Sequence, residues 1–129
     1  SFGLGEVDSS KPILLVEGEI DLLKLVSLGF DNVVAIGSAT PAKKQITVLP
    51  SSTIILGLDS DSAGKAGALS LARQMHGKLV YLVDWGLVGV KDPGEINNRD
   101  DVLLALKNKT IFKEKITRGT HKWQSQAGF

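Results

Sequence analysis

Four short apolar runs alternate with helical segments along this chain of 129 residues, and this alternation limits the fold more than any other feature. Runs of this length and composition are typical of buried strands in a parallel sheet. Parallel strands joined by helices produce a sheet covered on both faces, with right-handed crossovers. We therefore predict an α/β fold with three layers and a central, mostly parallel sheet of four strands, at residues 13–16, 32–37, 52–59 and 78–85.

The helical segments have recognisable beginnings and ends. Gly29 and Gly77 stop two of them, and Thr40 followed by proline begins a third, weaker one. Asn98, with Asp101 three residues later, resembles a capping arrangement at the start of the last one. The predicted helices cover residues 19–29, 40–49, 62–77 and 97–109.

The composition excludes several classes of protein. The chain has no cysteine, which excludes disulfide scaffolds, zinc–thiolate sites and thiol nucleophiles, and which fits a reducing compartment. No apolar run approaches the roughly 20 residues of a membrane span, and no signal peptide is visible. We therefore expect a cytoplasmic protein with no membrane partner. Because the first residue is Ser1, we also expect a piece of a longer protein.

The chain divides into three parts by composition. Residues 1–10 are rich in glycine and serine and are predicted to be a linker, and residues 11–107 form the predicted domain. Residues 108–129 are predicted to be a basic tail or helix, because 105–129 carry six basic side chains and one acid. Basic charge with interleaved aromatic rings suits single-stranded nucleic acid, but packing against the domain, or against a neighbouring domain, is the favoured explanation of this part.

Acidic side chains stand where the predicted strands end. Asp59 and Asp61 lie at the end of the third strand, Glu17 follows the first, and Asp92 follows the fourth. The carboxyl ends of parallel strands share one edge of the sheet, where ligands bind. Carboxylates held close together repel each other unless a cation lies between them, and oxygen ligands suit Mg²⁺ or Mn²⁺. The alternative is that Asp61 or Ser62 only caps the next helix and that Asp59 is solvated.

Two other families are disfavoured by spacing. A P-loop needs four residues between its first glycine and Gly-Lys-Ser/Thr, whereas six residues separate Gly57 from Gly64, and Ala66 follows Lys65. A phosphoacceptor receiver domain has an acidic pair after its first strand and two further strands before its lysine. Here Glu17 is followed by glycine, and a single strand separates Asp59 from Lys91.

The motifs "VEG", "VVAIGSAT", "LDSDSAGKAGALSLARQM" and "VKDPGEI" together resemble the TOPRIM domain of primase type, found in bacterial DnaG-type primases and phage primase–helicases. The likeness covers residues 11–106, and it implies that Glu17 is a general acid/base or a metal ligand. It also implies that Asp59, Asp61 and Asp92 bind the metal. Candidates for nucleotide or phosphate contacts are Gly18, Lys65, Lys91 and Glu95.

The chain departs from the family pattern at one position. Gly94 stands where the second aspartate of the primase Asp-Pro-Asp segment would be, so either Glu95 replaces it or one metal position is weakened. The family also has topoisomerases, but their tyrosine nucleophile has no counterpart here, because Tyr81 falls within a predicted strand.

The resemblance implies Mg²⁺- or Mn²⁺-dependent nucleotidyl transfer that makes RNA primers on single-stranded DNA. It also implies that the domain works beside other domains of a larger primase or primase–helicase, so the fragment need not be active alone. A metal-dependent nuclease would use the same acids, and a TOPRIM module that only binds nucleic acid or a partner protein stays open as well.

Overall fold

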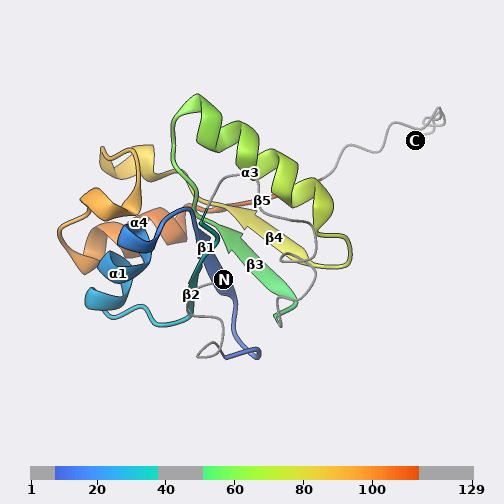
Figure 1. Cartoon of the computed structure of the whole chain (residues 1–129), viewed down its shortest axis with the longest axis horizontal. Coiled ribbons are helices and arrows are strands. Elements are labelled where there is room, and N and C mark those ends of the chain that lie inside the picture. The colour runs from blue at the N-terminus through green and yellow to red at the C-terminus, as the bar shows by residue number, and fades with distance from the viewer. Residues whose placement is uncertain (1–7, 38–50, 114–129) are drawn as a thin grey trace.

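The computed structural model describes residues 8–37 and 51–113, and it has the predicted alternation of strands and helices (Figure 1). The predicted helix at 40–49 lies outside the described residues, as does most of the basic tail. The elements in chain order are β1 (Ile13–Val16), α1 (Glu19–Ser27), β2 (Val33–Ala35), β3 (Thr53–Leu56), α3 (Ser62–Gln74), β4 (Leu79–Leu82), the 3₁₀ turns η2 (Trp85–Val88) and η3 (Pro93–Glu95), α4 (Arg99–Lys107) and β5 (Thr110–Ile111).

Within residues 8–37 and 51–113, the sheet has five strands in the order β2-β1-β3-β4-β5. The first four pair in parallel, which confirms the predicted parallel sheet. The predicted number of strands is corrected, because β5 pairs antiparallel with β4 through Tyr81–Ile111 and Leu82–Thr110. Beyond β5, the Phe112 amide donates to the Val80 carbonyl at 2.8 Å, so the folded unit continues past residue 107.

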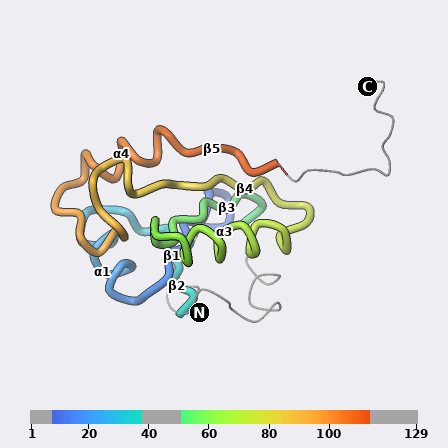
Figure 2. The backbone as a smooth tube through the Cα atoms, turned by 90° about the horizontal axis from the view of Figure 1, so that it is seen from above, coloured from blue at the N-terminus to red at the C-terminus, as the bar shows by residue number. Residues whose placement is uncertain are grey.

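Helices cover both faces of the sheet, which confirms the three-layer fold (Figure 2). Successive side chains of a strand point to opposite faces. Ile13 and Leu15 of β1 therefore pack with Leu71 of α3, whereas Leu14 and Val16 pack on the opposite side. That side is covered by α1 and α4, whose buried apolar residues are Leu22, Leu25, Val102 and Ala105. All four residues of β1 are buried, as its continuous apolar run predicted.

The helix ends follow local chemistry. Gly29 has a φ of 97°, which ends α1 in the left-handed conformation that glycine tolerates best. The predicted cap of α4 is present, because the Asn98 side chain accepts a hydrogen bond from the Asp101 amide at 2.9 Å. Within the described ranges, no helix is long and apolar enough to cross a membrane.

Trp85 joins the core to the loop that carries the acids. Its side chain is fully buried, and its Nε1–H donates to the Gly57 carbonyl at 2.9 Å. A Cβ on Gly57 would lie 2.9 Å from the indole, so glycine is needed for this contact. The indole therefore supports the chain just before Asp59.

Candidate active site

The carboxyl ends of β1 and β3 and the segment after β4 meet at one edge of the sheet (Figure 1). Acidic residues follow these strand ends in the sequence. Five acidic residues form this group, which we call the acidic edge: Glu17, Asp21, Asp59, Asp61 and Asp92. The negative charges of the other four all act on Asp59. Sequence reasoning anticipated four of these residues and missed Asp21.

Asp59 has an unusual protonation equilibrium. Its pKa is raised from 3.8 to about 6, first by partial burial and then by the charges of four neighbouring acids, which are, in decreasing order of effect, Glu17, Asp92, Asp21 and Asp61. Desolvation and like charges both disfavour the ionised form of a carboxyl. A cation at this position would favour the ionised form and so oppose this rise in pKa.

Glu17 follows β1 directly, and one of its carboxylate oxygens is in an unfavourable position. Within the described residues, its Oε1 is buried and has no hydrogen-bond partner. A buried polar atom without a partner is costly, so such an atom at a sheet edge indicates an interaction with a ligand.

Asp21 lies on the buried side of α1, four residues after Glu17. One carboxylate oxygen accepts from the Gly18 amide at 3.2 Å, and the other accepts from the Gly94 amide at 3.0 Å. Burial, and to a smaller extent the charge of Asp92, raise its pKa to about 6, against the opposing effect of the Gly18 hydrogen bond. An acid beside the apolar stripe of a predicted helix was the signal that could have revealed it, because buried acids are rare without partners.

Gly94 is the point where η3 meets α1. Its amide donates to Asp92 Oδ1 at 2.9 Å and to Asp21 Oδ1 at 3.0 Å, so two carboxylates converge on one N–H group. A Cβ at position 94 would lie 2.9 Å from Asp21 Oδ1 and 3.0 Å from Asp92 Oδ1. A side chain at this position would therefore require both carboxylates to move, and glycine lets them approach the same N–H group closely.

Asp61 has two partners of its own within the acidic edge. Its Oδ1 accepts from the Gly64 amide at 2.8 Å and caps α3, and its Oδ2 lies 3.5 Å from the Lys91 ammonium. The hydrogen bond from Gly64, followed by the interactions with Lys91, lowers the pKa of Asp61. The helix cap considered in the sequence analysis is present.

Ser60, between the two aspartates, holds the loop that carries Lys91. Its amide donates to the Lys91 carbonyl at 2.7 Å, and its hydroxyl lies 3.0 Å from that oxygen and 3.2 Å from the Val90 carbonyl. Sequence reasoning missed this residue, because a serine in a loop gives no signal of a partner thirty residues away.

The other predicted contact residues have more local roles. The amide of Gly18 is bonded to Asp21, and Glu95 Oε1 accepts from the Lys91 amide at 3.0 Å. Lys65 stands in the first turn of α3, at the wall of a pocket.

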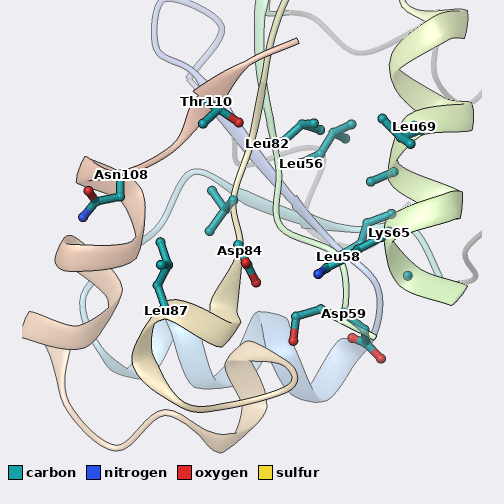
Figure 3. Close-up of a pocket in the computed structure, with 14 residues that line it drawn as sticks. Leu56, Leu58, Asp59, Lys65, Leu69, Leu82, Asp84, Leu87, Asn108 and Thr110 are labelled. Carbon is teal, nitrogen blue, oxygen red and sulfur yellow. The ribbon is translucent and has the colours of Figure 1, made fainter. Parts of the chain in front are cut away.

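This pocket opens beside the acidic edge and has a volume of about 580 Å³ (Figure 3). Lys65 reaches in from α3, Asp84 stands on the opposite wall, and Asp59 lies at the lower end. The remaining walls are mainly apolar, with Leu56, Leu58, Leu69, Leu82 and Leu87 among them. A cavity of this size with a few polar groups is typical of a small-molecule site.

Comparison with known proteins shows to which family this chain belongs. A family model described as Toprim-like matches residues 14–96, which is more than half of the chain. The chain belongs to the Toprim-like family. The predicted resemblance to a primase-type TOPRIM domain is thereby confirmed, and the relatives described next are primases or their homologues.

Two relatives of this Toprim-like chain are much longer than the part that it matches. The DNA primase of Mycoplasma pneumoniae is 31% identical over 91 residues, which cover 65% of this chain and 15% of the relative. The Twinkle homolog protein, chloroplastic/mitochondrial, of Arabidopsis thaliana is 28% identical over 104 residues, with the same two coverages of 65% and 15%. The chain therefore spans about a seventh of these relatives.

Solved structures show the same fold. The crystal structure of the zinc-binding and RNA polymerase domains of the Aquifex aeolicus primase has a TM-score of 0.67 and 27% identity. The match covers 78% of this chain and 26% of that one. A DNA primase domain from Pseudomonas aeruginosa has a TM-score of 0.70 at 20% identity, covering 84% of this chain and 37% of the other, and supports the fold alone.

The Toprim-like edge offers oxygen donors to a hard divalent cation. In the described part of the chain, no group of three acids or histidines is close enough to form a complete cage for a metal. Mg²⁺ does not need one, because it is usually held by one or two carboxylates, with water and substrate phosphates completing its shell. The unpartnered oxygen of Glu17 and the raised pKa of Asp59 fit a cation shared by these two residues.

The raised pKa of Asp59 makes the stability of the metal-free chain dependent on pH. Because the folded state favours the protonated carboxyl, this stabilising contribution is complete below about pH 3.8 and is lost as the pH rises through about 6. We expect Asp59→Asn to raise the melting temperature at pH 7.5 by a few degrees, and to raise it less at pH 5.

Thermal unfolding at the two pH values, followed by circular dichroism in the presence of a chelator, measures this effect. Asp31→Asn is the matched control, because Asp31 is an exposed acid just before β2, at the opposite edge of the sheet. An equal gain at both pH values, or a gain in the control, would contradict the assigned cause.

Proposed function

We propose that this Toprim-like domain is the catalytic module of a DNA primase-like protein that makes RNA primers on single-stranded DNA. The observation that carries the proposal is the convergence of Glu17, with its unpartnered buried oxygen, and Asp59, with its raised pKa, at one edge of the sheet. Similarity to DNA primases supports the choice of reaction.

Glu17 and Asp59 would hold Mg²⁺ or Mn²⁺, and Asp92 stands beside them with one oxygen on the Gly94 amide. When bound, such a cation offsets the negative charge on the attacking and leaving oxygens of nucleotidyl transfer. The carboxylates of Glu17 and Asp59 repel each other without a cation. With the cation bound, both would be ionised, as the site requires.

In the proposed reaction, the 3′-hydroxyl of the growing primer attacks the α-phosphate of a ribonucleotide, and pyrophosphate leaves. The Glu17 carboxylate accepts the hydroxyl proton, directly or through a water molecule. Lys65, at the wall of the pocket beside Asp59, is proposed to meet the phosphates of the incoming nucleotide.

Other domains of a longer polypeptide are proposed to hold the template. The relatives and the solved primases extend well beyond the part that this chain matches. The test is therefore made with the full-length protein rather than with the domain alone.

The deciding experiment supplies single-stranded DNA, ribonucleotides and Mg²⁺ to the full-length protein and separates the labelled products by gel electrophoresis. Short RNA that depends on template and metal supports the proposal. Degradation of the DNA with no nucleotides present would instead indicate a metal-dependent nuclease. Neither product, with folded protein and with DNA retained, would indicate a module that only binds.

A further inference from the structure

We infer that the outward side of α1 is a docking surface, covered in the full-length protein by an apolar surface of another domain of the same polypeptide. Three apolar side chains form it, Ile20, Leu23 and Val26, and we call them the outer stripe of α1. The inference depends on the chain being part of a longer protein, and it does not depend on the reaction proposed above.

Helix α1 is apolar on both of its sides. Its inner side packs Leu22 and Leu25 into the core against the sheet. On its outer side, Ile20 is 75% exposed, Leu23 is 56% exposed and Val26 is 48% exposed. Residues three positions apart are neighbours on a helix surface, so these three side chains form a continuous stripe. A helix that is apolar all round is typical of a buried helix, whereas a surface helix has a polar outer side.

Helix α3 shows the pattern expected of a helix that faces water. It lies on the opposite side of the sheet from α1 (Figure 1). Its outward positions include Lys65, Ser70 and Arg73, and its large exposed apolar side chain, Leu69, lines the pocket. Single exposed apolar residues are common, but a contiguous set of them marks an interaction surface. The outer side of α1 therefore suits an apolar partner, and that of α3 suits solvent.

The size of the outer stripe favours a domain of the same polypeptide over a second copy of the chain. A stable interface between separate molecules buries roughly 800 Å² on each partner, and three side chains are too few to fill this area. A linked domain needs less, because the covalent connection gives it a high effective concentration. This chain matches only 15% of the length of two relatives, so most of the polypeptide of those relatives lies outside the match.

The outer stripe begins beside the acidic edge. A Cβ on Gly94 would lie 3.6 Å from Ile20 Cγ2, and the Gly94 amide donates to both Asp21 and Asp92. A domain that covers Ile20 therefore lies next to these acids. Docking on α1 would place the surface of that domain along one side of the candidate active site.

The test compares the chemical accessibility of position 23 in the 129-residue chain and in the full-length protein. Leu23→Cys introduces a thiol into a chain that has no cysteine. Ser70→Cys, at an exposed position of α3, is the matched control. The rate of alkylation by iodoacetamide is measured at each position by mass spectrometry of the peptide that contains it.

We expect Leu23→Cys to be alkylated at least about tenfold more slowly in the full-length protein than in the chain alone, which corresponds to a docked population of about 90%. Ser70→Cys is expected to react at the same rate in both proteins. Equal rates at position 23 in the two proteins would overturn the inference, and so would equal slowing at both positions. Slow alkylation already in the 129-residue chain would overturn it as well, and a rate that falls with chain concentration would then identify a second copy as the occupant.

A triple variant tests whether the outer stripe causes the protection. Ile20→Gln and Val26→Gln are added to Leu23→Cys, and because both side chains are exposed, the melting temperature of the 129-residue chain is expected to change by no more than a few degrees. In the full-length protein, alkylation at position 23 is expected to return to the rate of the chain alone. Protection that persists in this variant would overturn the assignment to α1. Because alkylation is measured without any activity, failure of the proposed priming reaction would leave this result unaffected.

Discussion

Replacement of Glu17 by glutamine is expected to reduce primer synthesis by the full-length protein about 10²–10⁴-fold, the range typical for loss of a general base. Glutamine has nearly the same shape, but it neither accepts a proton at neutral pH nor carries the charge that attracts a cation. Removal of one charge from a crowded acidic group should at the same time leave the fold intact. The expected result is therefore an inactive protein that melts no lower than the original.

Glu19→Gln provides the matched control two residues further on. Glu19 is exposed in the first turn of α1, so the same chemical change there removes a charge outside the acidic edge. Activity within about threefold of the original is expected for this control, as for most surface changes. Initial rates of RNA synthesis, with the two variants at equal concentration, give the comparison. Near-normal activity of the Glu17 variant would remove the central residue from the proposed mechanism.

Gly64→Ala is expected to destabilise the domain by about 3 kcal/mol or more, which lies in the upper range for single substitutions. A Cβ at this position would overlap the carbonyl oxygen of Asp59 and lie 2.7 Å from its carbonyl carbon. The clash involves backbone rather than a flexible side chain, so α3 or the Asp59 loop must shift. Because Gly64 also donates to Asp61, the shift would displace both aspartates.

The sign of this effect separates the steric explanation from helix propensity. Alanine is favoured over glycine in a helix by about 1 kcal/mol, so without the clash the change would stabilise the domain. Ala66→Gly, at an exposed position in the same helix, is expected to cost about that amount and serves as the reference. Urea unfolding of both variants gives the free energies. A Gly64→Ala domain as stable as the original would show that the helix can move away freely.

The central strands could be predicted because their signals are local. β1 is a continuous apolar run that is buried on both faces, and Glu17 and Asp59 follow strands whose parallel pairing places their ends together. β5 could not be predicted in the same way. It has two exposed residues, and it exists only because β4 offers a free edge beside it.

Other parts of the candidate site depend on contacts between distant residues. The Asp21 carboxylate accepts a hydrogen bond from the Gly94 amide, 73 positions further along the chain. No local sequence pattern around Asp21 indicates this partner. Ser60 and Lys91 meet only after β3 and β4 have paired and the loop after β4 has turned back. Sequence reasoning therefore located the acids at strand ends, whereas their hydrogen-bond partners became visible only in the folded chain.

The hydrogen bond between Trp85 and Gly57 has a consequence for the effect of substitutions in the core. The acids repel one another, so their arrangement is held by scaffolding from the interior, and the indole bonded to Gly57 is part of that scaffolding. A substitution of Trp85 would leave all the carboxylates of the acidic edge in the sequence and still allow them to move apart. Such a substitution would have the same effect as loss of a site residue, although it lies in the hydrophobic core.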